Sequence, residues 1–205
     1  MGMIVPFGSK EEIHIMFDRI LNEHLTCFKS LAQLSEAISN AGRMLIETIE
    51  NGKKILICGN GGSASDAQHF VAEIVGRFTR ERSAWPAVAL NTDSSLITAI
   101  ANDYAYSEVF SRQVEALGVS GDILIGISTS GNSKNVIQAA VQAKAKRMQT
   151  IALVGNKGGS LIEHADISII IPSDITARIQ EVHIFILHFW AEMIESTITH
   201  GKESS

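Results

Sequence analysis

Five short apolar runs alternate with segments of helical periodicity, and this alternation constrains the fold more than any other feature of the chain. Strands with continuous apolar residues are typical of parallel sheets that are buried on both faces. The helical segments between them supply the right-handed crossovers that parallel strands need. The sequence therefore predicts an α/β protein, a three-layer αβα sandwich around a five-stranded parallel sheet. The predicted strands are 55–58, 86–90, 123–127, 150–154 and 167–171.

Two further helices are predicted before the first strand, over residues 10–25 and 28–51. Apolar residues in the second helix recur every three or four positions, which forms one stripe along a helix, and Asn51-Gly52 is a typical helix end. Because these helices precede the sheet, they are not crossovers, and their apolar faces need either the sheet or another subunit as a partner. The stripe consists of Leu31, Leu34, Ile38, Ala41, Leu45 and Ile49.

Length and charge limit the classes of protein that fit. The 205 residues suit one domain spanning 1–205, and the net charge of −5 argues against nucleic-acid binding through bulk electrostatics. Cys27 and Cys58 give no disulfide framework, which fits a reducing compartment. Residues 1–18 lack the pattern of a signal peptide, and no apolar stretch is long enough to span a membrane. We therefore expect a cytoplasmic protein with no membrane or nucleic-acid partner.

A glycine-rich turn, Gly59-Asn60-Gly61-Gly62-Ser63, follows the first predicted strand. Its glycines allow a positive φ or close approach to a ligand, and Ser63 or Ser65 is expected to cap the helix that follows. A helix start of this kind binds anions, although many such turns bind nothing. The turn matches neither the dinucleotide-binding fingerprint nor the P-loop, so a phosphate site stays open on this feature alone.

A second polar turn follows the third strand and carries four hydroxyls within six residues, those of Ser128, Thr129, Ser130 and Ser133. For an ordinary capped turn two serines would suffice. In a parallel sheet, ligands bind beyond the carboxyl ends of the strands, where both turns are placed. The two turns together favour a phosphate cradle built mainly from hydroxyl and backbone dipoles.

Two predicted helices carry side chains that bind metals or move protons. His69 and Glu73 are four residues apart and share one helix face, while Gln180 and His188 lie two turns apart on the last helix. Together they could bind zinc or a similar metal. Alternatively, Glu73 and His188 act as base and acid without metal, or the residues form a surface ion pair and a core histidine. His183 lies off this face and is interpreted as structural or as a neighbour of the site.

Five motifs occur in an order that resembles the SIS (sugar isomerase) domain family, and the resemblance extends over nearly the whole chain. It implies a flavodoxin-like SIS fold with additional N-terminal helices. Within the family the chain is most similar to members that convert D-sedoheptulose 7-phosphate to D-glycero-D-manno-heptose 7-phosphate through an enediol. That reaction is the first step towards the ADP-heptose or GDP-heptose precursors of lipopolysaccharide or surface glycans. The motifs are GNGGS at 59–63, QHF at 68–70, ND at 102–103, GISTSGNS at 126–133 and ARIQEVH at 177–183.

The resemblance also implies a role for each matching residue. Glu73 and His188 would be the acid–base pair, and Glu73 and Gln180 would also contact substrate. If Glu73 is both metal ligand and base, one role must weaken the other. One zinc ion per subunit would be bound by His69, Glu73, Gln180 and His188. The sugar would be bound by Asn60, Gly61, Gly62, Asn102 and Asp103. The phosphate and adjoining hydroxyls would be bound by Ser63, Ser128, Thr129, Ser130 and Ser133. The family implies a homotetramer with sites at subunit interfaces, in which helices 10–51 take part in packing.

Other SIS proteins are competing interpretations. Those that bind the replication initiator DnaA share most of these loops, but their pattern lacks an acid at position 73 and a histidine at 188, and it has Arg in place of Ser130. This sequence keeps the enzyme-type residues Glu73, His188 and Ser130, which favours the isomerase. A sugar-phosphate-sensing regulator would usually carry an added DNA-binding domain, for which we expect no room in this chain.

Overall fold

The computed structural model describes residues 8–203, and the first seven residues of the 1–18 segment lie outside this range. All five strands are parallel, and their order in the sheet is β2-β1-β3-β4-β5. The predicted sheet is therefore confirmed: the first and last strands have the predicted bounds, and the ends of the other three differ by at most one residue. The strands are β1 (Ile55–Cys58), β2 (Ala87–Ala89), β3 (Ile123–Ser128), β4 (Gln149–Gly155) and β5 (Ile167–Ile171).

Helices cover both faces of the sheet and bury a separate apolar core on each side, which gives the three-layer sandwich. One core contains residues of α2, α3 and α7, and the other contains residues of α4, α5 and α6. The α-helices are α1 (Lys10–Lys29), α2 (Ser35–Glu50), α3 (Gly62–Val75), α4 (Ser94–Asp103), α5 (Ser111–Leu117), α6 (Lys134–Ala145) and α7 (Thr176–Glu203). The short 3-10 helices are η1 (Ser30–Gln33), η2 (Tyr106–Glu108) and η3 (Ser160–His164).

The leading helices divide later than the periodicity predicts. α1 begins at a capping box formed by Ser9 and Glu12 and continues to Lys29, and η1 separates it from α2. Leu31 and Leu34 therefore lie in the link rather than in the α2 stripe. The other four stripe residues are buried on the sheet, because a helix laid on a sheet buries only one face. They are Ile38, Ala41, Leu45 and Ile49.

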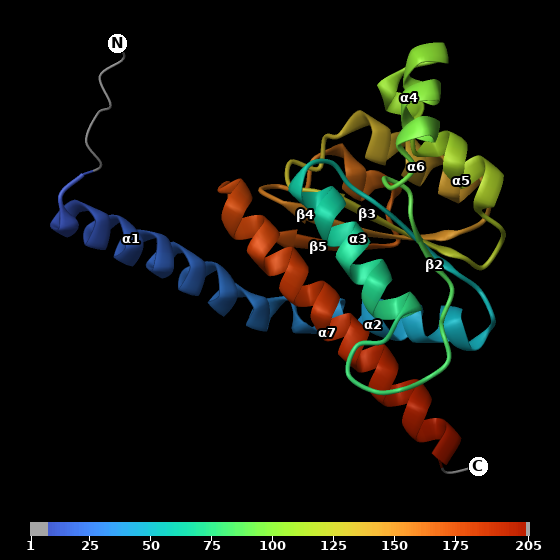
Figure 1. Ribbon diagram of the computed structural model, residues 1–205, viewed down its shortest axis with the longest axis horizontal. Coiled ribbons are helices and arrows are strands. Elements are labelled where there is room, and N and C mark those ends of the chain that lie inside the picture. Colours follow the sequence, from blue (N-terminus) through green and yellow to red (C-terminus); the bar gives the residue numbers. More distant parts are fainter. Residues whose placement is uncertain (1–7, 204–205) are drawn as a thin grey trace.

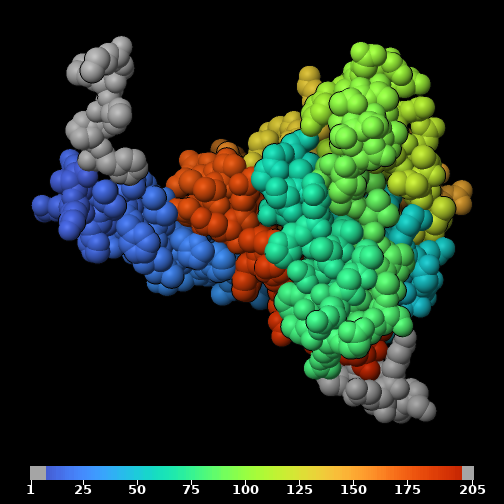
Figure 2. All heavy atoms as spheres, in the orientation of Figure 1, coloured from blue at the N-terminus to red at the C-terminus, as the bar shows by residue number. Residues whose placement is uncertain are grey.

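The first half of α1 extends away from the sheet and its covering helices (Figures 1 and 2). Six large apolar side chains along the whole of α1 are more than one third exposed, so this helix presents an uncovered apolar surface. No helix in the described part of the chain is long and apolar enough to cross a membrane. The exposed apolar residues are Ile13, Ile15, Met16, Phe17, Leu21 and Leu25.

Candidate active site

The two polar turns meet at the switch point of the sheet. β1 and β3 are neighbours, but α3 and α6, the helices that follow them, pack on opposite faces. Asn60 of the first turn and Asn135 of α6 exchange two side-chain hydrogen bonds, of 2.9 and 2.8 Å. The Tyr106 hydroxyl donates to Asn60 Oδ1 at 3.1 Å. The motifs gave no signal for Asn135 or Tyr106, because these contacts form only when the chain folds.

The glycine-rich turn starts α3 without help from a serine side chain. Gly61 is the N-cap with a φ of 57°, and both Ser63 and Ser65 lie inside the helix. The predicted serine cap is therefore wrong, because the positive φ of Gly61 lets the helix begin at Gly62. A Cβ on Gly62 would lie 2.5 Å from Nε2 of Gln180, so the Gln180 amide of α7 lies directly against the start of α3.

The serine-rich turn, residues 128–133, is held in a closed shape. The hydroxyls of Ser128 and Ser133 lie 3.0 Å apart, and the Ser130 hydroxyl accepts a hydrogen bond from the Asn132 N–H at 3.1 Å. The Gly131 carbonyl accepts from the Leu161 N–H at 2.9 Å, and the Thr129 carbonyl accepts from the Gly155 N–H at 3.1 Å. The turn is thus tied to the segment that follows β4, and its hydroxyls are gathered at the carboxyl edge of the sheet.

α3 and α7 lie side by side and run in the same direction, because each returns along the same sheet face after a parallel strand. Their contacts stay in step, from Gly62 against Gln180 to His69 beside His188. His69 Nε2 lies 3.0 Å from His188 Nε2 and 3.1 Å from Glu73 Oε1. The packing thus brings together three of the four residues proposed as metal ligands.

These three residues fit a transition metal. One ligand atom from each of His69, Glu73 and His188 lies within 4.8 Å of the others. Ligands bound tetrahedrally to zinc at about 2.0–2.1 Å lie roughly 3.3 Å from one another, close to the two separations measured from His69. Two imidazoles and one carboxylate form the donor set of a zinc site that keeps a further position open. Asp66 lies one turn before His69 on α3. Burial raises the pKa of its carboxyl to about 6, although the nearby His69 has a smaller effect in the opposite direction.

Asn102 and Asp103 belong to α4, whereas His69, Glu73 and His188 belong to α3 and α7. They end α4, although the sequence predicts that they break it at 101. Both are exposed, and the Asn102 amide donates to Asp103 Oδ1 at 3.0 Å. The segment after them carries Tyr106 to Asn60, which leads from α4 to the glycine-rich turn.

Comparisons with known proteins identify the family of this chain. The SIS domain model matches residues 21–155. A phosphoheptose isomerase from Helicobacter pylori is 58% identical over 172 residues, which cover 84% of this chain and 90% of the relative. The chain belongs to the phosphoheptose isomerase family of SIS domain proteins. A phosphoheptose isomerase from Aliarcobacter butzleri is 50% identical, with 85% of this chain and 93% of the relative covered.

Solved structures of the same family share this fold. The phosphoheptose isomerase from Francisella tularensis aligns with a TM-score of 0.85 and 38% identity, covering 93% of this chain and all of that one. The enzyme from Neisseria gonorrhoeae aligns with a TM-score of 0.82 and 43% identity, covering 92% and 99%. The fold in which α3 and α7 lie on one sheet face is therefore the fold of this family.

His183 is the buried histidine between the two site residues of α7. Its Nε2 lies 3.3 Å from the Val154 carbonyl, and its Nδ1 has no partner. Burial lowers the pKa of His183 to about 4, and the hydrogen bond to Val154 opposes this only in part. Its side chain is therefore neutral at pH 7 and packs in the core, which agrees with the structural interpretation of the sequence.

His183 predicts a loss of stability in mild acid. The unfolded chain takes up a proton near pH 6.5, but folded His183 resists until about pH 4, so the free energy of unfolding falls as the pH drops through that interval. The free energy of unfolding that depends on this histidine should fall by about 3 kcal/mol between pH 6.5 and pH 4. The His183→Gln variant should lose stability less steeply than the unmodified protein between pH 6.5 and 4, as measured by urea unfolding. His14→Gln on exposed α1 is the control, and a similar change in slope there would refute the assignment.

Proposed function

We propose that the protein catalyses the interconversion of D-sedoheptulose 7-phosphate and D-glycero-D-manno-heptose 7-phosphate. The juxtaposition of Glu73 and His188 with His69, in a chain so similar to phosphoheptose isomerases, carries this proposal. The alternative of a non-enzymatic protein that binds DnaA leaves the clustered acid and histidines without a purpose. The chain would act as one SIS domain over residues 1–205.

The spacing within α3 supports a long phosphorylated sugar as the substrate. Gly62 starts the helix and His69 follows seven residues later, a rise of about 10 Å along the axis. An open seven-carbon chain with a terminal phosphate spans a comparable length. The phosphate would lie in the turns, on Ser63, Ser128, Thr129, Ser130 and Ser133, and the carbonyl end would lie beside His69 and Glu73. Asn60, Gly61, Gly62, Asn102, Asp103 and Gln180 would contact the sugar between them.

Glu73 and His188 supply the two proton carriers that the shift from ketose to aldose needs. One removes a proton from C1 and returns it to C2, while the other moves the proton between the oxygens in the opposite sense. The two side chains project from different helices towards a shared point, so a substrate carbon chain there would contact both. A zinc ion held by His69, Glu73 and His188 would polarise the carbonyl and orient the hydroxyls. The fourth proposed ligand, Gln180, lies within this chain against Gly62 at the start of α3, apart from these three residues.

The setting of the reaction follows from the same proposal. The uncovered apolar surface of α1 supports its use, with the rest of residues 10–51, in packing a homotetramer. Each active site would then lie at an interface between subunits. The reaction would take place in the cytoplasm, as the first step towards activated heptose for lipopolysaccharide or another surface glycan.

Turnover of sedoheptulose 7-phosphate by the purified protein tests the proposal. We expect isomerisation by the unmodified protein, at least a tenfold loss of rate after incubation with a chelator, and recovery when zinc is added. The rate is measured as formation of the aldose phosphate. Full activity in the presence of the chelator would reject the requirement for a metal, and the isomerase activity itself would stand. No turnover under any metal condition would reject the isomerase, and binding of purified DnaA would then be measured.

A further inference from the structure

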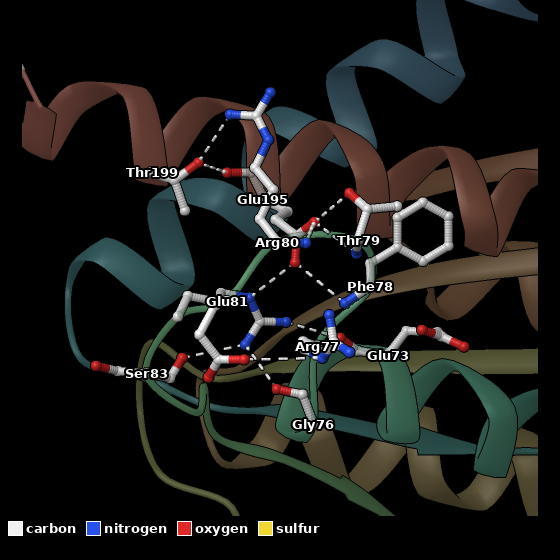
Figure 3. Close-up of polar contacts among 11 residues, drawn as sticks. Glu73, Gly76, Arg77, Phe78, Thr79, Arg80, Glu81, Ser83, Glu195 and Thr199 are labelled. Atoms are coloured by element: carbon white, nitrogen blue, oxygen red, sulfur yellow. Dashed lines mark hydrogen bonds and ion pairs between the residues drawn. The ribbon is translucent and has the colours of Figure 1, made fainter.

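Glu195 is a buried carboxylate on α7 that the proposed chemistry does not use. Its side chain is 1% exposed, and it accepts hydrogen bonds from the N–H groups of Phe78, Thr79 and Arg80 at 3.0, 2.8 and 2.9 Å (Figure 3). The Thr79 hydroxyl adds a bond of 2.7 Å. Burial raises the pKa of Glu195, but the bonds from Thr79, Arg80 and Phe78 outweigh it and lower the pKa to about 2. The carboxylate is therefore charged and fixes the segment after α3.

Arg82 connects this carboxylate to the end of α3. Its Nε donates to Glu195 at 3.2 Å, and another guanidinium nitrogen donates to the Glu73 carbonyl at 2.7 Å. The third nitrogen donates to the carbonyl of Gly76 at 3.3 Å, and the guanidinium lies 3.6 Å above the Trp85 ring. Arg82 thus satisfies backbone carbonyls that a helix end leaves without partners, and one of them belongs to Glu73.

The same segment also contacts the other half of the proposed acid–base pair. The Phe78 ring lies 5.9 Å from the His188 ring, and its backbone N–H is held by Glu195. Glu195 follows His188 by two turns on α7, so both ends of this link belong to one rigid helix. The network therefore connects the backbone of Glu73 and the side chain of His188 through a single carboxylate.

We propose that Glu195 and Arg82 form a positioning clamp that sets the separation of Glu73 from His188. This inference rests on the proposed function, because it assigns the clamp to the acid–base and metal cluster. α3 and α7 are separate helices, and a ligand set tolerates only small changes in the distance between them. The clamp joins the two helices just beyond the cluster, where a shift would change that distance directly.

Two variants test the clamp. Glu195→Gln removes the charge, and Arg82→Lys keeps the charge but cannot bridge Glu195 and Glu73 with a planar fork. We expect each to weaken zinc binding or lower kcat by about 10- to 100-fold, as partners outside the ligand set do in other metal sites. KM for the sugar phosphate should change by no more than about twofold, because the phosphate turns lie at the other end of α3. Zinc affinity is measured by competition with a chromogenic chelator, which requires no turnover.

Asp122→Asn is the matched control. Asp122 is also a buried carboxylate, fully enclosed, and accepts hydrogen bonds from the N–H groups of Lys54 and Val119 and an ion pair from Lys54 Nζ at 2.6 Å. It lies at the amino ends of β1 and β3, the opposite edge of the sheet. We expect the Asp122→Asn substitution to lower the unfolding temperature. Zinc affinity and kcat should not change when they are measured at a temperature where the variant is folded.

Either of two results would overturn the clamp. The first is a folded Arg82→Lys or Glu195→Gln protein with unchanged zinc affinity and kcat, and Arg82→Lys provides this test if Glu195→Gln does not fold. The second is an equal loss in Asp122→Asn, which would reduce the effect to general destabilisation. Zinc binding by the unmodified protein without turnover would reject the proposed function alone, and the affinities of the variants would still decide the clamp.

Discussion

Replacing Glu73 by glutamine is expected to lower kcat for sedoheptulose 7-phosphate by roughly a hundredfold to ten-thousandfold. The amide has nearly the shape of the carboxylate but cannot take a proton from carbon. His188→Gln removes the other proton carrier, and we expect a loss of similar size. Because the side chain of Glu73 is 22% exposed, the free energy of unfolding should change by less than about 1 kcal/mol. Kinetics with saturating zinc measure the chemical role separately from metal affinity.

The control for this series is Glu50→Gln. Glu50 is exposed at the end of α2, which leads into the amino end of β1, and should leave kcat unchanged. A Glu73→Gln protein that keeps more than about a tenth of the original kcat would show that another group is the base. Loss in Glu73→Gln with full activity in His188→Gln would restrict the acid–base role to the carboxylate.

Gly131→Ala is expected to destabilise the fold by about 3 kcal/mol or more and to lower kcat/KM by roughly a hundredfold. Gly131 has a φ of 66°, and its added Cβ would lie 1.8 Å from the Gly158 carbonyl oxygen. That oxygen belongs to the backbone, so neither side of the contact can move away by changing a rotamer. The serine-rich turn must therefore separate from the segment after β4, which displaces the hydroxyls proposed to bind phosphate.

Gly52→Ala separates the two causes of this effect. Gly52 has a similar φ of 68°, but nothing lies within 4 Å of its added Cβ. It should cost about 1 kcal/mol, the strain of a left-handed alanine, and leave the kinetics unchanged. Urea unfolding and kinetics of both variants measure the difference. Equal stability of the two proteins would mean that the turn relaxes without loss, and the proposed phosphate cradle would then be poorly fixed.

Local patterns in the sequence carried much of the fold, and their errors have local causes. Mainly apolar runs identified all five strands, since burial on both faces leaves few polar positions in them. The ends of α1 and α2 were misplaced because a 3-10 link keeps apolar spacing close to that of an α-helix. The sequence predicts a cap on α3 at Ser63 or Ser65, whereas the positive φ of Gly61 lets the helix begin earlier. Backbone geometry of this kind leaves little trace in composition.

The sequence by itself determined which side chains share one helix face. His69 and Glu73 are four residues apart on α3, so the helix alone brings them together. Only the tertiary structure decided that His188 joins them, at 3.0 Å from His69, because that contact depends on two helices separated by more than one hundred residues packing side by side. The clamp from Glu195 to Arg82 and Phe78 likewise has no local signal. Periodicity describes one element at a time, and the distance between elements is set by the packing of the core.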